Sequence, residues 1–138
     1  GRRFTVGASG ASLNAPGNSQ TADQVKPEVE HIGAIGPGSY YYDPTAFAAV
    51  NEVRYGTSGR NIMRAPGAVN LDFSLFRRFP IKERLVLEFR AESYNFTNTP
   101  QFGTPSSNVA NGDFMRVTGT SGSINQDRQF RLGLRFQF

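Results

Sequence analysis

Apolar and polar residues alternate strictly over the last nine positions of the chain. Every second residue from 130 to 138 is Phe or Leu, and the positions between them hold Arg, Gly and Gln. Successive side chains of a β-strand point to opposite faces, so this alternation predicts a strand at 130–138 with one apolar face. Its apolar residues, which we expect to form a closing or assembly strand, are Phe130, Leu132, Leu134, Phe136 and Phe138.

Two earlier stretches, 69–79 and 85–97, alternate in the same way, and the short polar connection at 80–84 predicts an antiparallel hairpin. Arg77 interrupts the apolar face near the predicted end of the first strand, where a long side chain can reach an interface. The apolar positions expected to face lipid or a partner are Leu71, Phe73, Leu75, Leu85, Leu87 and Phe89. The opposite, polar face of these strands and of the last one carries Asp72, Glu88, Arg90, Glu92, Arg131 and Arg135.

The rest of the chain is less regular. Weaker alternation predicts short strands at 3–9 and 114–120, and the dipeptide Asp43-Pro44 predicts a helical turn within 45–50. Gly- and Pro-rich stretches at 10–38 and 98–111 are expected to be loops. The fold class is therefore all-β and antiparallel, with residues 1–39 as a weak strand plus loop and residues 40–138 as barrel-type strands with connecting loops.

Composition supports this fold class and restricts the chemistry. Twelve Phe, five Tyr, 15 Gly and eight Pro among 138 residues are typical of a turn-rich all-β chain. There is no Cys, so disulfides and thiolate metal sites are excluded, and His31 is the only histidine. No apolar run approaches the roughly 18 residues of a membrane-spanning helix. We expect neither a cofactor nor a metal.

The charges do not indicate catalysis or nucleic-acid binding. The net charge is +4, and the basic residues are mostly Arg spread along the chain. Rings and arginines alternate onto opposite faces, whereas a stacking platform for nucleic acid needs both on one face. Glu88, Arg90 and Glu92 share a face, but the arginine between the carboxylates favours an ion-pair ladder over general acid–base chemistry. The glycines around Gly56 to Gly67 resemble a phosphate-binding loop without the following Gly-Lys-Ser/Thr. With no catalytic set recognisable, we do not expect an enzyme.

Two architectures fit strands with one uncharged apolar face and one charged face. In a soluble sandwich the apolar faces stack on each other, and in an outer-membrane barrel they face lipid while the charged residues face a water-filled interior. Strand lengths near a bilayer crossing, rings near the strand ends and the terminal Phe138 favour the barrel.

Several short motifs between residues 40 and 138 carry a resemblance to a known family. They are Gly59-Arg60-Asn61, Arg64 to Gly67, Asn70 to Phe76, Glu83-Arg84-Leu85, Phe89 to Glu92, Asn95 to Asn98 and Phe102-Gly103. With these motifs, residues 40–138 resemble the carboxy-terminal barrel strands of TonB-dependent outer-membrane receptors, in the branch that carries a carboxypeptidase-regulatory-like domain at its amino end. Phe138 resembles the terminal residue by which the assembly machinery recognises the last strand of a barrel.

The resemblance implies the closing strands of a receptor barrel in the bacterial outer membrane, with a structural role in substrate uptake. Its partners would be lipid and the rest of the barrel, because four or five strands fall short of the roughly 22 that such a barrel needs. Counting back from a last strand that ends at the periplasm, five strands put the long 98–111 connection on the periplasmic side.

An alternative follows if the 138 residues are the whole molecule. Residue 1 is Gly rather than Met, which is consistent with a processed piece of a longer protein. A small amphipathic sheet with open edges would then bind identical copies by strand addition and form a homopolymeric fibre or tube, outside the cell as a shed or assembled fragment.

Overall fold

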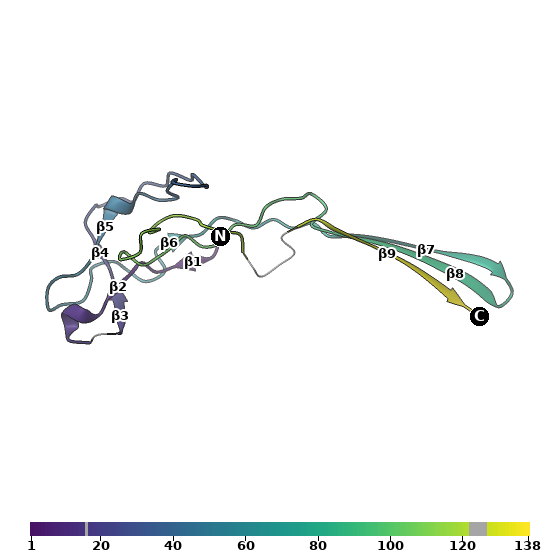
Figure 1. The fold of residues 1–138 in the computed structure, drawn as a ribbon, viewed down its shortest axis with the longest axis horizontal. Coiled ribbons are helices and arrows are strands. Elements are labelled where there is room, and N and C mark those ends of the chain that lie inside the picture. The colour runs from purple at the N-terminus through teal and green to yellow at the C-terminus, as the bar shows by residue number, and fades with distance from the viewer. Residues whose placement is uncertain (16, 122–126) are drawn as a thin grey trace. The chain divides into compact units, whose positions relative to one another are not determined.

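The computed structural model describes residues 1–15, 17–121 and 127–138 (Figure 1). The chain forms two compact units. Unit 1 comprises Gly1–Gly67 and Phe102–Thr120, and unit 2 comprises Ala68–Gln101 and Ser121–Phe138. Every pairing between named strands is antiparallel, and no α-helix occurs in the described ranges. The predicted all-β antiparallel class is therefore confirmed.

Unit 2 contains one three-stranded sheet in which β8 lies between β7 and β9 (Figure 1). These strands span Phe73–Lys82, Leu85–Tyr94 and Gln129–Gln137. The predicted strand at 130–138 is confirmed with a shift of one residue. The predicted strand at 85–97 begins correctly but ends three residues early, at Tyr94.

Asn95 ends β8. It has a left-handed backbone with φ of 48°, and it is fully buried. Its side-chain Oδ1 accepts a hydrogen bond from the Thr99 N–H at 3.0 Å, and its Nδ2 donates to the Thr99 carbonyl at 3.2 Å. Asn tolerates this conformation better than most residues and can bond to nearby backbone. The strand therefore stops at a turn that the alternating pattern alone does not reveal.

The predicted strand at 69–79 was misplaced at both ends, because β7 begins at Phe73 and continues through Pro80 to Lys82. The connection predicted at 80–84 is in fact the two-residue turn Glu83–Arg84. Proline lacks the N–H of a ladder hydrogen bond, and sheets tolerate it at edge strands and bulges. Pro80 meets both conditions, since β7 is an edge of this sheet and its register shifts between Pro80 and Lys82.

The predicted strand at 114–120 is wrong. Phe114 and Thr120 form only isolated bridges, with Ser106 and Phe102 respectively. Met115 has φ of 59°, which breaks an extended backbone, and its side chain is completely buried. The sheet runs directly from β8 to β9. With one strand fewer, the connection from β8 to β9 leaves the sheet at the end opposite the Glu83–Arg84 turn, and the five-strand count behind its expected periplasmic location no longer applies.

Unit 1 is built from short strand pairs. β1 (Arg3–Phe4) pairs with β6 (Met63–Arg64), β2 (Gly7–Ser9) with β3 (Ser19–Thr21), and β4 (Asp23–Gln24) with β5 (Phe47–Ala48). The predicted strand at 3–9 divides into β1 and β2 because each half has a different partner. The stretch 10–38, predicted to be loop, contributes β3 and β4.

Two short 3-10 turns complete unit 1, at Ala11–Leu13 and Pro44–Ala46. The second replaces the helical turn predicted at 45–50. Asp43 begins it, because its Oδ1 accepts a hydrogen bond from the Thr45 N–H at 2.9 Å and Pro44 has the fixed φ of a first helical residue. It ends after three residues, where β5 starts.

The core of unit 1 is small and draws residues from distant parts of the chain. Phe47 and Phe114 contact edge to face, with ring centroids 6.3 Å apart. The buried members of this core are Phe4, Val6, Ala8, Ala22, Ala46, Phe47, Met63, Ala65, Phe114 and Met115. These residues tie the strand pairs of unit 1 to the segment at 102–120.

Candidate membrane-facing sheet

The register of the three long strands aligns side chains into rows across the sheet. Directly opposite residues of antiparallel strands share a face. One face, which we call the apolar face, has the rows Phe79–Leu87–Phe136, Arg77–Phe89–Leu134, Leu75–Ala91–Leu132 and Phe73–Ser93–Phe130. The other, the polar face, has the rows Arg78–Glu88–Arg135, Phe76–Arg90–Gly133 and Ser74–Glu92–Arg131.

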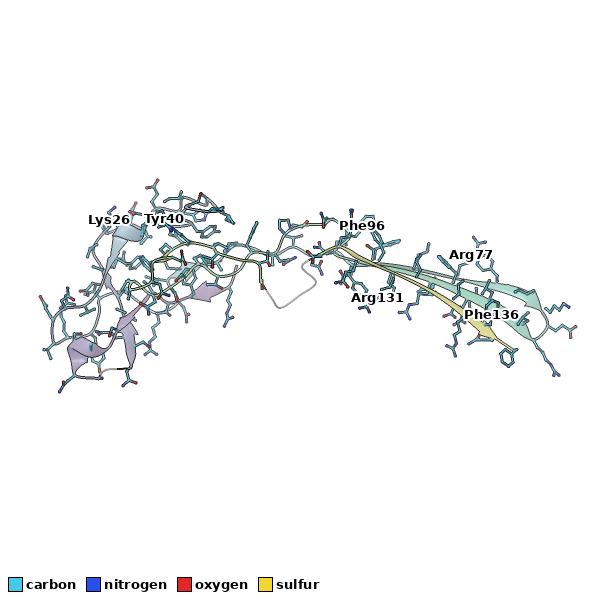
Figure 2. All side chains as sticks on the ribbon, in the orientation of Figure 1. Lys26, Tyr40, Arg77, Phe96, Arg131 and Phe136 are labelled. Carbon is cyan, nitrogen blue, oxygen red and sulfur yellow. The ribbon has the colours of Figure 1, made fainter. Side chains whose placement is uncertain are left out.

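The apolar face is open rather than sealed in a core. Leu132 is 76% exposed and Leu134 is 67% exposed, while Leu87 and Phe89 on the central strand are half-buried. Figure 2 shows side chains projecting from both faces of the sheet. Exposed apolar surface of this extent is costly in water, because burial is worth about 25 cal/mol for each Å². These residues need a cover that the sheet itself does not supply.

Ion pairs organise the polar face. Arg78 Nε lies 2.8 Å from Glu88 Oε2, and Arg90 lies 2.6 Å from Glu92. Glu92 also accepts a hydrogen bond from the Tyr94 hydroxyl at 3.3 Å. The carboxylates are thus paired with arginines, as predicted, although sequence reasoning missed Arg78 as the partner of Glu88. Each pair contributes about 0–1 kcal/mol because the arginines are exposed to solvent.

A guanidinium lies over a ring near each end of the apolar face. Arg77 is 5.2 Å from the centroid of the Phe79 ring, and Arg128 is 5.7 Å from that of Phe130. On the polar face, Arg131 lies 4.9 Å from the Tyr94 ring. The expected position of Arg77 near a strand end was wrong, because β7 continues for five residues beyond it.

Three predicted site residues lie outside the strands. Leu71 and Asp72 precede β7, and Phe138 follows β9. Asp72 Oδ1 accepts a hydrogen bond from the Asn95 N–H at 2.9 Å, so this carboxylate links the start of β7 to the turn after β8. The Leu71 carbonyl accepts one from the Phe96 N–H at 2.7 Å. Sequence reasoning missed this closure because it depends on the turn at Asn95.

Both edges of the sheet lack a paired strand within the part of the chain that the structure describes. β7 and β9 each pair with β8 on one side only. Backbone N–H and C=O groups along such edges bind water or a further strand. The sheet therefore has two sites at which another strand can be added.

Ion pairs also stabilise unit 1. Arg54 binds Asp23 with two hydrogen bonds, at 2.7 and 2.8 Å, and lowers the pKa of that carboxyl. Lys26 Nζ lies 2.6 Å from Asp43 Oδ2, and this contact, together with hydrogen bonds from Thr45, lowers the pKa of Asp43 to about 2. Burial raises the pKa of the Tyr41 phenol. These interactions fasten the loops between the short strands.

Other chemistry-bearing residues of unit 1 have structural roles. His31 packs against Tyr41 and Tyr42, with ring centroids 4.8 and 4.9 Å away. Gly56, in the stretch that resembles a phosphate loop, instead packs against the backbone of Thr21. No group of three His, Cys, Asp or Glu residues lies close enough to hold a metal ion in the described ranges.

Unit 1 also contains a pocket of about 370 Å³ beside Arg116. The Arg116 guanidinium lies 4.5 Å from the Tyr40 ring centroid and donates a hydrogen bond to the Tyr40 hydroxyl at 2.9 Å. No local pattern predicts this contact, because the two residues are 76 positions apart in the sequence. The other lining residues are Ile35, Gly36, Pro37, Gly38, Phe102, Asp113, Val117, Thr118, Gly119 and Thr120.

An antiparallel sheet with an exposed apolar face, an ion-paired polar face and two open edges has the features of an outer-membrane barrel segment. No helix among the described residues is long and apolar enough to cross a bilayer. Residues 1–131 match the family model described as an outer membrane beta barrel domain, and the chain belongs to this family. Its location is the bacterial outer membrane. No curated protein and no solved structure matches the chain.

The family match covers a different range from the resemblance to TonB-dependent receptors. That resemblance is good from Tyr40 onward and thin before it, whereas the matched range begins at residue 1 and so includes β1 to β4. It ends at Arg131, within β9. The short strands and loops of unit 1 are thus part of the family pattern.

Proposed function

We propose that β7, β8 and β9 are the closing strands of a TonB-dependent outer-membrane receptor barrel, with a structural role in substrate uptake. In this proposal the apolar face contacts lipid and the polar face lines the water-filled interior. The open edges of β7 and β9 pair with the remaining strands of the barrel.

The observation that carries this proposal is the arrangement of the connections. Outer-membrane barrels have short periplasmic turns and long external loops. The Glu83–Arg84 turn has two residues, whereas residues 95–128 connect β8 to β9 at the other end of the sheet. A sheet oriented by this rule has its turn at the periplasm, and β9, antiparallel to β8, runs toward the same side.

Strand length supports the same proposal. β7 and β8 have ten residues each. Ten residues at roughly 3.3 Å each, tilted by about 40°, span about 25 Å, the height of the apolar band of such barrels. Phe79 and Phe130, the rings next to Arg77 and Arg128, lie near opposite ends of this span, where aromatic residues gather at membrane interfaces.

The second candidate is a homopolymer of this chain. The two open edges of the sheet favour it, because identical copies can supply the missing strands as well as a barrel can. In that case the apolar faces of neighbouring copies cover each other, and lipid is not needed.

The size of the native polypeptide distinguishes the candidates. An antibody against unit 1 should detect, in isolated outer membranes, a protein several times larger than the 15.1 kDa of these 138 residues, because a receptor barrel of this class needs about 22 strands. A native polypeptide of about 15 kDa that sediments as a large assembly without lipid would refute the receptor and support the homopolymer.

A further inference from the structure

Arg77 has an unusual position for a residue on a lipid-facing surface. Its row partners Phe89 and Leu134 lie on the apolar face, and β7 continues on both sides of it. An arginine in hydrocarbon is costly, so such side chains extend toward the nearest interface. The Arg77 guanidinium lies over the ring of Phe79, one row nearer the Glu83–Arg84 turn.

A β-bulge brings a second cation to this end of the apolar face. Pro80 pairs with Val86 and Lys82 pairs with Leu85, so two steps along β7 match one step along β8. Leu85 shares a face with Leu87 because the two are separated by one residue of β8. Lys82, opposite Leu85, is therefore on the apolar face, whereas simple alternation would put it on the polar face.

The two cations lack acidic partners in the sheet. Among the described residues neither Arg77 nor Lys82 forms an ion pair, whereas Arg78 and Arg90 on the polar face each pair with a glutamate. The rows of the apolar face contain no Asp or Glu. Phe79 lies between the two cations along β7, in the aromatic position expected at a membrane interface. The arrangement leaves positive charge where the headgroups of the adjacent leaflet would be.

We propose that Arg77, Phe79 and Lys82 form a binding site for the phosphate of an anionic glycerophospholipid. The inference rests on the proposed function, because it requires the apolar face to be in a bilayer with the Glu83–Arg84 turn at the periplasmic surface. The arginine and lysine bind the phosphate, and the Phe79 ring packs against the upper acyl chain. An acidic protein partner is less suitable, because the surrounding apolar rows favour acyl chains.

Lipid quenching of a single tryptophan tests this site directly. These 138 residues contain no Trp, and any Trp elsewhere in the full-length protein is first replaced by Phe. Phe136→Trp puts the probe in the same row as Phe79, and Leu132→Trp puts a control probe two rows farther from the turn. The protein is reconstituted in phosphatidylcholine vesicles with brominated phosphatidylglycerol or brominated phosphatidylcholine as quencher. The ratio of the two quenching constants measures headgroup preference at each probe.

We expect the quenching constants to show about a fivefold preference for phosphatidylglycerol in the Phe136→Trp protein and no preference in the Leu132→Trp protein. A factor of about five is the effect of one basic residue that binds near an anionic membrane surface. Adding the double substitution Arg77→Gln/Lys82→Gln should abolish the preference. The matched control Arg78→Gln/Arg135→Gln removes the same charge from the polar face and should retain it. Glycerol phosphate added to the buffer should not reduce the preference, since the site binds lipid rather than free phosphate.

The outcomes separate this site from the proposed function. Quenching by both lipids without headgroup preference, or equal loss of preference in the two double variants, would overturn the lipid site while the membrane-facing sheet stands. Competition by glycerol phosphate would replace the lipid site with a general phosphate site. Absence of quenching at both probes would refute the membrane-facing sheet itself, and the lipid site with it.

Discussion

Gly56 allows two segments of unit 1 to approach more closely than a side chain would permit. A Cβ atom at this position would lie 1.9 Å from the Thr21 carbonyl oxygen and 2.6 Å from that of Ala22. Both neighbours are backbone atoms, so they cannot move aside by a change of rotamer. The glycine is required by packing, and the resemblance to a phosphate loop has no part in it.

Gly56→Ala should therefore destabilise unit 1 by about 1–3 kcal/mol, the usual cost of overpacking. Urea unfolding followed by the near-ultraviolet circular dichroism of the tyrosines measures this loss. Gly67→Ala is the matched control, since nothing lies within 4 Å of its added Cβ, and we expect a change within about 0.5 kcal/mol. Equal unfolding midpoints for the two variants would contradict the predicted close approach.

Asp43 gives unit 1 a pH dependence with a definite sign. Lys26 and Thr45 lower its folded-state pKa to about 2, from a usual value of 3.8. A carboxyl with a lowered pKa adds stability that is complete above the unfolded pKa and is lost as pH falls through the folded pKa. We expect the contribution of Asp43 to be constant above about pH 5, to decline below about pH 4 and to vanish below about pH 2.

The measurement is urea unfolding of unit 1 at a series of pH values, in the wild-type chain and in Asp43→Asn. The variant should show a smaller acid-induced loss, because the asparagine cannot titrate. The carboxyl carbon of Asp43 should titrate in nuclear magnetic resonance spectra near pH 2. A midpoint near 3.8 would show that Lys26 and Thr45 do not hold the ionised form.

Residues with left-handed backbone explain several differences between prediction and structure. Asn95 ends β8 and Met115 breaks the stretch that was predicted as a strand at 114–120. Alternation of apolar and polar residues reports which side chains share a face, but it does not report φ. Asn is a residue type that favours turns, so Asn95 was a possible sign of a strand end. Nothing in the sequence around Met115 indicates its left-handed backbone, because that conformation depends on burial in the core of unit 1.

At the scale of elements, the long strands were predictable and the short ones were not. The nine alternating residues at 130–138 define the two faces of a strand by themselves, independently of the rest of the chain. The bounds of β9 accordingly differ from the predicted ones by one residue. β4 and β5 have two residues each, too few for any periodicity. Their pairing is set by contacts across the fold, such as the bidentate contact of Arg54 with Asp23 in β4.

The bulge in β7 shows a second limit of sequence patterns. Pro80 was placed in the polar connection at 80–84, after the predicted strand. At a sheet edge it is tolerated, and the extra residue in the ladder reverses the face on which Lys82 lies. The lipid site could therefore not be recognised from alternation.

Ser74 and Leu75 are adjacent in β7 and lie on opposite faces, so substitutions at these positions test the two faces at nearly the same depth in the bilayer. Leu75→Arg adds a cation to the apolar face and should destabilise the membrane-inserted protein by about 2–4 kcal/mol if it lies near the bilayer centre. Ser74→Arg adds the same charge to the polar face, opposite Glu92, and should change stability by less than about 1 kcal/mol. Urea unfolding from vesicles measures both. Equal losses would exclude a lipid-facing apolar face.

At the scale of the whole molecule, the two ends of the sheet differ in their chain connections. Residues 1–67 precede β7, and residues 102–120 lie between β8 and β9, so the chain segments that lead to and from unit 1 all leave the sheet at the end opposite the Glu83–Arg84 turn. The strand that was wrongly predicted at 114–120 hid this relation. One extra strand before β9 moves every earlier connection to the opposite end of the sheet. With three strands, the long connections leave the sheet at one end and the short turn is at the other, as in outer-membrane barrels generally.

Sidedness of labelling in cells tests this arrangement. These 138 residues contain no Cys, and any Cys elsewhere in the full-length protein is first replaced by Ser, which gives single-cysteine variants. Val53, in unit 1, is 89% exposed, and Glu83 lies in the turn. A membrane-impermeant maleimide should label Val53→Cys on intact cells, whereas Glu83→Cys should be labelled only after the outer membrane is permeabilised. Labelling of both variants after permeabilisation is the control for reactivity. If Glu83→Cys alone reacts on intact cells, the sheet is inverted and β9 does not run toward the periplasm. If both react equally, the sheet does not cross the membrane, and strand addition between identical copies becomes the better account of its open edges.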